Sequence, residues 1–205
     1  MTKSLLLPRV GGWKDLDAFA RGAVDVVCWP EAFPYRPEVR FAIAHDGRAL
    51  LIRFQVAEDN VRAVTTENNG PVWEDSCVEF FVKEPDSPYY FNFETNCIGT
   101  GLAAKRLSRD AFTHFDAEQM ARVGRRSSLP FAPVDIRERT EWSLELEIPF
   151  ALITDQGGVP ERLLANFYKC GDKTAVPHFL SWNPVEVPSP DFHRPEFFGE
   201  LILKP

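Results

Sequence analysis

Two glutamates in this 205-residue sequence have the spacing of a chemical site. Glu79 and Glu94 lie in separate runs that alternate apolar with polar residues, so both carboxylates share one face if the runs pair. A carboxylate pair on one face is the minimum that a glycoside hydrolase needs for its acid and nucleophile. Such pairs are also common on the faces of sheets that bind nothing, so the pair alone does not establish catalysis.

Two tryptophans next to loops suggest a different chemistry. Trp73 lies in NNGPVWEDS and Trp182 in LSWNPVEVPSP, where the alternation does not demand a core residue. Sugar rings have apolar C–H faces and hydroxyl rims, so carbohydrate sites combine flat aromatic side chains with a few polar groups. Exposed tryptophans would fit a sugar site, and the alternative is that both rings belong to the core, as we expect for Trp13, Trp29 and Trp142.

The common catalytic signatures are missing from the sequence. It has no GxSxG, HExxH, Walker or GxGxxG motif, and its four histidines have no partners at metal-ligand spacing. The four cysteines form no CxxC pair and are expected to be small buried residues, with three disulfide pairings open. They are Cys28, Cys77, Cys97 and Cys170.

Composition limits the kinds of partner. Lys and Arg total 23 against 30 Asp and Glu, which gives a net charge of −7 and argues against nucleic-acid and anionic-membrane partners. No stretch reaches the roughly 20 apolar residues of a membrane span. The apolar run after Lys3 is too short for a signal peptide, so we expect a cytoplasmic protein or a processed secreted or periplasmic form.

Short alternating segments must position these residues. Residues 39–56 read as a hairpin with an Asp-Gly turn, and residues 78–96 read as a second hairpin. Strand patterns return at 134–148 and near the C-terminus, while PFALI reads as one helical turn and 107–126 as either a helix or a loop. The pattern predicts one all-β domain over residues 1–205, an antiparallel two-sheet β-sandwich, jelly-roll-like, with at most one short helix.

The second hairpin also predicts which side chains share a face. Val78, Phe80 and Phe93 fall on an apolar face, which leaves Glu79, Asn92 and Glu94 together on the other face as a polar surface for a ligand. The same alternation places Cys77 and Cys97 on opposite faces, so a disulfide between them would need a β-bulge.

The sequence resembles the family 9 carbohydrate-binding modules, which are found attached to xylanases. The resemblance rests on VWEDSCVEFFV, supported in the right order by HDGRALLIRFQVAEDNV, YYFNFETN, WSLELEIPFALI, ANFYKCGD, SWNP and EFFGELIL. It implies non-catalytic binding of a glucan or xylan chain end, such as cellulose or xylan, in service of a glycoside hydrolase partner. A purely structural sandwich and a hydrolase that uses Glu79 and Glu94 are the alternatives, and the oligomeric state is not indicated.

The resemblance also implies a site. Two tryptophans would clamp the terminal sugar while a strand glutamate and further polar residues bind its hydroxyls. The matching positions are Trp73, Trp182, Glu79, Asn92, Glu94 and Lys169. Asn92 and Glu94 stand where the xylanase modules carry an arginine and an asparagine, which leaves the sugar undetermined. Family members bind structural calcium, for which Glu58, Asp59 or Asp75 would serve, although the sequence shows no spaced calcium loop.

Overall fold

The computed structural model describes residues 2–154 and 158–205, and most of its regular structure is strand. Nine strands form the larger sheet: β1 (Ser4–Leu7), β3 (Val26–Val27), β7 (Cys77–Lys83), β8 (Tyr90–Asn96), β9 (Gly101–Arg106), β10 (Phe112–His114), β14 (Arg162–Cys170), β15 (Phe179–Ser181) and β16 (Gly199–Leu203). Their order is β1-β16-β14-β7-β8-β9-β10, with β15 paired to both β14 and β3.

The remaining elements form two smaller sheets and a few helical turns. The five-stranded sheet has the order β11-β13-β5-β4-β2: β2 (Ala20–Ala23), β4 (Glu38–His45), β5 (Ala49–Glu58), β11 (Gly124–Ser127) and β13 (Thr140–Pro149). A third sheet pairs β6 (Val61–Ala63) with β12 (Val134–Ile136). The helical elements are α1 (Ala117–Arg122), α2 (Phe150–Ile153) and the 3-10 turns η1 (Trp13–Ala18), η2 (Val72–Glu74) and η3 (Pro195–Phe197).

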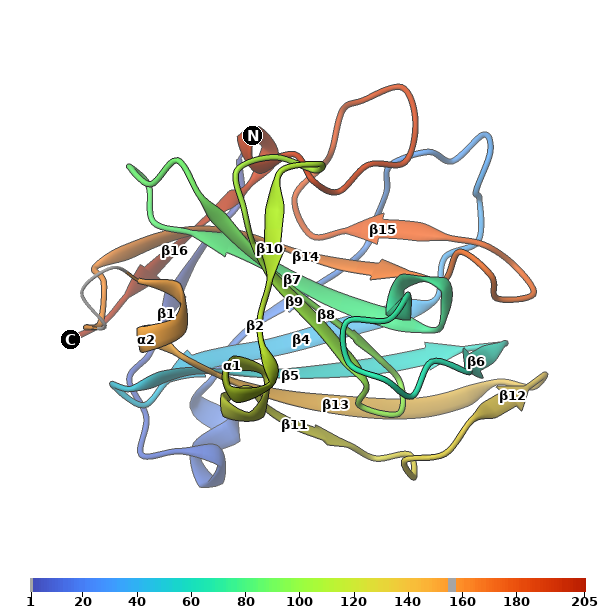
Figure 1. The fold of residues 1–205 in the computed structure, drawn as a ribbon, viewed down its shortest axis with the longest axis horizontal. Coiled ribbons are helices and arrows are strands. Elements are labelled where there is room, and N and C mark those ends of the chain that lie inside the picture. The colour runs from blue at the N-terminus through green and yellow to red at the C-terminus, as the bar shows by residue number, and fades with distance from the viewer. Residues whose placement is uncertain (1, 155–157) are drawn as a thin grey trace.

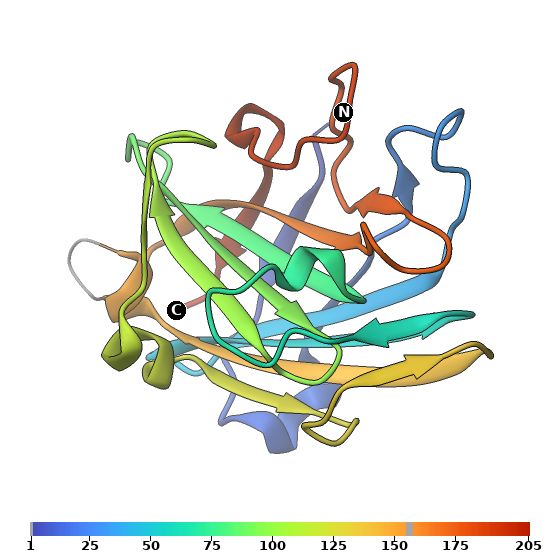
Figure 2. The same cartoon turned by 45° about the vertical axis from the view of Figure 1, so that its right-hand side comes forward.

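The two larger sheets face each other across one hydrophobic core. In both views β7, β8 and β9 cross diagonally over β4, β5 and β13 (Figures 1 and 2). The rings of Phe41 from β4 and Phe167 from β14 stack with their centroids 3.8 Å apart, and Phe54 and Phe80 pack around them. Burial of these inward residues removes apolar surface from water and thereby fixes the outward residues of the same strands on the opposite face.

Both predicted hairpins are confirmed. β4 pairs with β5 in antiparallel fashion around the Asp-Gly turn, and β7 pairs with β8 so that Glu79 lies opposite Glu94 and Phe81 opposite Asn92. Cys77 and Cys97 lie in different hydrophobic clusters, as their placement on opposite faces requires. The four cysteines are free thiols.

Three features of the predicted fold need correction. The strands of the described residues form three sheets instead of two, and β1 runs parallel to β16. The same part of the chain holds two short α-helices instead of at most one. The predicted turn in PFALI is α2, and the uncertain segment 107–126 contains α1, which a capping box between Asp116 and Gln119 stabilises. The weak apolar spacing there reflects that Met120 is the buried residue of α1. The jelly-roll-like winding stays a prediction.

The outer face of the larger sheet is not open to water along its whole length. A second hydrophobic cluster lies on it, where Phe81, Tyr90 and Tyr168 pack beneath Phe192 and Phe198 of the C-terminal segment. The rings of Tyr168 and Phe192 stack with their centroids 4.2 Å apart. The C-terminal segment therefore covers part of the face that carries Glu79 and Glu94, and it leaves a bounded cavity in place of a flat surface.

Candidate functional site

A cavity of about 310 Å³ lies on this outer face, and we call it the site cavity. Its volume is at the lower end of the roughly 300–1,000 Å³ of small-molecule sites. Six strands (β7, β8, β9, β10, β14 and β15), the η2 turn and the C-terminal segment contribute to it. Its lining residues are Trp73, Glu79, Glu94, Arg106, Arg109, Asp110, Phe112, Cys170, Asp172, Phe179, Pro190, Asp191, Phe192 and His193.

Two carboxylates from neighbouring strands form the bottom of the site cavity. Glu79 on β7 and Glu94 on β8 are direct cross-strand partners, and their residues are only 3% and 4% exposed. The Cys170 thiol donates a hydrogen bond to Glu79 Oε1 over 3.0 Å, and the Asn92 amide donates one to Glu94 Oε1 over 2.9 Å. Each carboxylate thus keeps one oxygen without a partner among these contacts, available to a ligand donor.

Burial and mutual repulsion alter the acidity of this carboxylate pair. Burial raises the pKa of Glu79 well above its usual value, and the neighbouring charge of Glu94 raises it further. Burial raises the pKa of Glu94 to about 7, although the Arg106 guanidinium opposes the shift. Near neutral pH the pair therefore holds at least part of a proton, so the site cavity offers both a carboxylate acceptor and a carboxyl donor.

Arg106 at the end of β9 connects the carboxylates to the cavity wall. Its Nε donates to Asn92 Oδ1 over 2.7 Å, its Nη1 donates to the Arg109 carbonyl over 2.7 Å, and its guanidinium lies 4.2 Å from the centre of the Phe112 ring. Asn92 itself is fully buried and lines no part of the cavity; it links Arg106 to Glu94. The sequence predicts a ligand contact for Asn92, whereas its side chain lies outside the cavity lining and holds Glu94 and Arg106 in place.

Aromatic rings stand at the rim of the site cavity. Trp73 lies in η2 and is 38% exposed, while Phe112 on β10 is 44% exposed. The Trp73 carbonyl accepts the backbone N–H of Asp172 over 3.2 Å, which ties the η2 turn to the loop after β14. An exposed indole on a braced turn is suited to stacking on a ligand, because the ring loses little freedom when it binds.

The C-terminal segment supplies the opposite wall. His193 Nδ1 lies 3.1 Å from the Tyr90 hydroxyl, and burial together with the Arg106 charge lowers the pKa of His193 to about 3. The imidazole is therefore neutral at physiological pH. Asp191 pairs with Arg194 within this segment at 2.8 Å, and it pairs with Arg109, which follows β9, at 3.7 Å.

Trp182 does not face Trp73, so the predicted two-tryptophan clamp is wrong. Trp182 is 4% exposed and lies in the main core, edge-on to Phe41 and Phe167 at centroid distances of 6.1 and 5.6 Å. A Cβ on Gly199 would come within 2.4 Å of the Trp182 ring, so glycine provides the space for it. The alternation continues from Leu180 through Trp182, and both side chains point inward.

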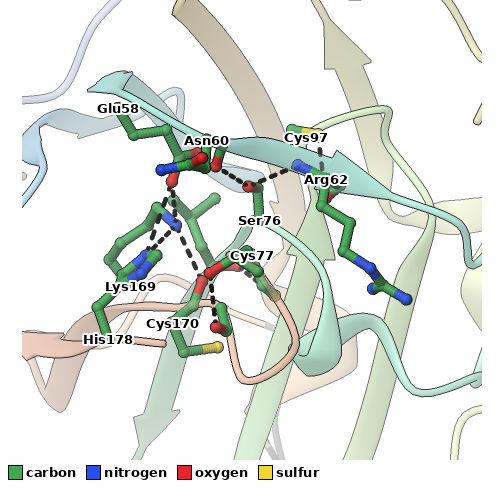
Figure 3. Close-up of polar contacts among 12 residues, drawn as sticks. Glu58, Asn60, Arg62, Ser76, Cys77, Cys97, Lys169, Cys170 and His178 are labelled. Atoms are coloured by element: carbon green, nitrogen blue, oxygen red, sulfur yellow. Dashed lines mark hydrogen bonds and ion pairs between the residues drawn. The ribbon is translucent and has the colours of Figure 1, made fainter. Parts of the chain in front are cut away.

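Lys169 is not part of the site cavity either. It lies on β14, opposite Val78 of β7, and its side chain is on the inward face and fully buried. Its Nζ pairs with Glu58 Oε2 at 3.0 Å and lies 2.7 Å from His178 Nε2, as the close-up shows (Figure 3). We call Glu58, Lys169 and His178 the interior charge cluster. The sequence does contain a signal for this placement. Every second residue of a strand shares one face, and Lys169 follows Ala165 and Phe167 on the inward face.

The carboxylates expected to hold calcium do not fit that ion. Glu58 accepts from Trp142 Nε1 over 2.8 Å and pairs with Lys169. Asp75 accepts from the backbone N–H groups of Val64 and Thr65 and pairs with Arg62. Calcium needs six to eight oxygen ligands with free lone pairs, whereas these oxygens already face N–H donors and positive charges. Asp59 is exposed and accepts a long 3.4 Å hydrogen bond from Tyr35.

Sequence reasoning missed several lining residues. Arg106, Phe112 and His193 had no motif to mark them, since each belongs to a segment that reaches the cavity only through tertiary packing. The alternation of β9 offered a weak local signal for Arg106, which lies opposite Tyr90 on the outer face.

The fold and this cavity define a β-rich ligand-binding module. The chain belongs to carbohydrate-binding family 9, whose family model matches residues 14–203. A candidate carbohydrate-binding protein from Bacteroides uniformis ATCC 8492 is 38% identical over the full length of both chains, with a TM-score of 0.92.

Two complexes of a family 9 module from Caldicellulosiruptor kristjanssonii share the fold. The glucose complex is 11% identical, with 98% of this chain and 96% of that chain covered and a TM-score of 0.66. The cellotriose complex is 12% identical, with 98% and 94% covered and a TM-score of 0.63. No curated protein matches the chain. None of the helices among the described residues has both the length and the apolar character of a membrane span.

Proposed function

We propose that the site cavity binds the end of a glucan or xylan-type saccharide without catalysing its hydrolysis. The observation that carries this proposal is an exposed indole, Trp73, at the rim of a cavity whose bottom is a pair of buried carboxylates. The Trp73 ring would cover the apolar face of one sugar, while Glu79 and Glu94 would accept its hydroxyl hydrogens. Phe112, rather than Trp182, would provide the second aromatic contact.

The kind of saccharide follows from the size of the cavity and from the relatives. A cavity of about 310 Å³ has room for one or two sugar rings, which favours a chain end over an extended chain. The related module from C. kristjanssonii has been crystallised with glucose and with cellotriose. We therefore place gluco-oligosaccharides first among the ligands and xylo-oligosaccharides second. A glycoside hydrolase acting on the same polymer would be the partner.

The experiment is calorimetric titration with glucose, cellotriose and xylotriose. We expect dissociation constants in the micromolar to millimolar range, as for small polar ligands. Trp73→Ala should weaken binding at least tenfold, because the stacking surface is lost. The matched control is Phe131→Ala, which removes an aromatic ring that is 67% exposed outside the cavity and should leave the affinity unchanged. Equal affinity for wild type and Trp73→Ala would refute the proposal.

Hydrolysis is the second candidate function. It is favoured by the direct opposition of Glu79 and Glu94 and by the pKa of about 7 for Glu94, which suits a general acid. Release of nitrophenol from an aryl glycoside, abolished in Glu79→Gln, would establish it. If the protein binds saccharide but releases no nitrophenol, its function is binding without hydrolysis.

A further inference from the structure

Two thiols and a carboxylate meet at the bottom of the site cavity. Cys77 on β7 and Cys170 on β14 are direct cross-strand partners, and Glu79 lies two residues beyond Cys77 on the same face. One ligand atom from each residue lies within 4.8 Å of the other two, and all three residues are buried. Nothing in the proposed saccharide function requires two thiols there.

The ligand atoms of this group lie close together as they would around a metal ion, and thiol protons occupy the space between them. The Cys170 thiol donates to Glu79 Oε1 over 3.0 Å, and the Cys77 thiol points to the carbonyl of Val78 at 3.6 Å. In a tetrahedral zinc site, bond lengths of about 2.3 Å to sulfur and 2.1 Å to oxygen separate the ligand atoms by roughly 3.5–3.8 Å. Small rotations of these side chains would therefore bring the three atoms to that spacing.

We propose that Cys77, Cys170 and Glu79 form a binding site for a thiophilic divalent cation, of which Zn²⁺ is the representative. Two thiolates and one carboxylate match the sulfur and oxygen donors that Zn²⁺ accepts. Binding replaces the two S–H bonds by two metal–sulfur bonds and releases two protons to the solvent. Glu79 coordinates through one oxygen as the carboxylate, so any proton that it shares with Glu94 stays on Glu94 or is released as well.

The fourth position of the ion would face the ligand. Cys170 and Glu79 both line the site cavity, whereas Cys77, beside Cys170 on the neighbouring strand, is fully buried and is not part of the lining. Three protein ligands and one open position is the arrangement in which zinc takes up a water or a substrate oxygen. The ion would thus present its open coordination position to the space in which we place the saccharide.

The test uses Co²⁺ as a spectroscopic probe on the full chain, reduced and kept under anaerobic conditions after EDTA treatment and desalting. We expect one equivalent of Co²⁺ to produce a near-ultraviolet sulfur-to-cobalt charge-transfer band, and one equivalent of Zn²⁺ to abolish it. Cys77→Ser and Cys170→Ser should each weaken binding at least tenfold and reduce the band, and Glu79→Gln should weaken binding with the band shape retained.

The control is Cys28→Ser, because Cys28 contacts Ser181 at 3.1 Å and belongs to no group of metal-ligating atoms in the described residues. It should bind Co²⁺ as the wild type does. Circular dichroism confirms that each variant is folded. A spectrum with oxygen and nitrogen ligands only, or a sulfur band that survives in both serine variants, overturns the proposal. The titration contains no sugar, so its outcome is independent of the saccharide proposal.

Discussion

Two groups of buried charged residues lie on opposite sides of the larger sheet, and they are built differently. The interior charge cluster faces the core, where Lys169 pairs with Glu58 at 3.0 Å. The carboxylate pair faces the site cavity, where Glu79 lies opposite Glu94. Lys169 and Cys170 are consecutive in β14, so the strand alternation alone separates a core residue from a cavity residue.

The two groups differ in how their charge is compensated. Glu58 accepts a hydrogen bond from Trp142 Nε1 in addition to its ion pair, and burial together with the Lys169 charge keeps the pKa of His178 well below its usual value. Glu79 and Glu94 instead carry like charges, and Arg106 offsets them only in part. A core cannot tolerate an unpaired charge, whereas a cavity can hold one until a ligand supplies the partner.

The largest expected effect is on stability and comes from breaking the interior charge cluster. Lys169→Met leaves the Glu58 carboxylate buried without its ion pair and should lower the free energy of unfolding by about 3–5 kcal/mol. Chemical denaturation measures it. The double variant Lys169→Met with Glu58→Gln should recover part of the loss, because it removes the uncompensated charge. A loss below about 1 kcal/mol would show that the pair contributes little.

In the pair of Glu79 and Glu94, a substitution should weaken ligand binding and should not lower stability. Glu79→Gln removes a charged acceptor for sugar hydroxyls and should weaken saccharide binding by about 1.5–3 kcal/mol, which is roughly tenfold to more than a hundredfold. Its free energy of unfolding should not fall, because the repulsion with Glu94 disappears. Calorimetric titration in EDTA measures the affinity. Glu118→Gln, an exposed change on α1, is the control and should alter neither quantity.

The pH dependence of stability should reflect the raised pKa values of Glu79 and Glu94. The folded-state pKa of Glu94, about 7, lies above its unfolded value, so the unfolded chain releases its proton first as the pH rises. Stability in metal-free buffer should therefore decrease between about pH 4.5 and 7, with a slope of up to about 1.4 kcal/mol per pH unit from this group. The double variant Glu79→Gln with Glu94→Gln should show a flatter profile. An unchanged profile would contradict the shift.

Calcium should have the smallest effect. Because Glu58 and Asp75 are occupied by protein donors, we propose that protein cations stabilise these carboxylates in place of calcium. Millimolar Ca²⁺ added to EDTA-treated and desalted protein should leave the melting temperature unchanged within about 1 °C. An upward shift of several degrees with Ca²⁺ would point to a site elsewhere in the chain.

Local periodicity determined much of the fold and part of the site. The alternation of β7 and β8 has a period of two, so it placed Glu79 and Glu94 on one face, and the structure pairs them directly across the two strands. The same alternation ran through Leu180 and Trp182 and through Phe167 and Lys169, where the resemblance to sugar-binding modules outweighed it and led to the wrong positions.

The amino-acid sequence by itself determined the β-rich fold, the family and the shared face of the two carboxylates, because each depends on residue order within short segments. Tertiary structure alone decided that Trp182 packs in the core, that the C-terminal segment encloses the cavity, and that Arg106 and His193 reach the carboxylates. These outcomes depend on contacts between segments far apart in the chain. Such contacts produce no recognisable pattern within a short stretch of sequence.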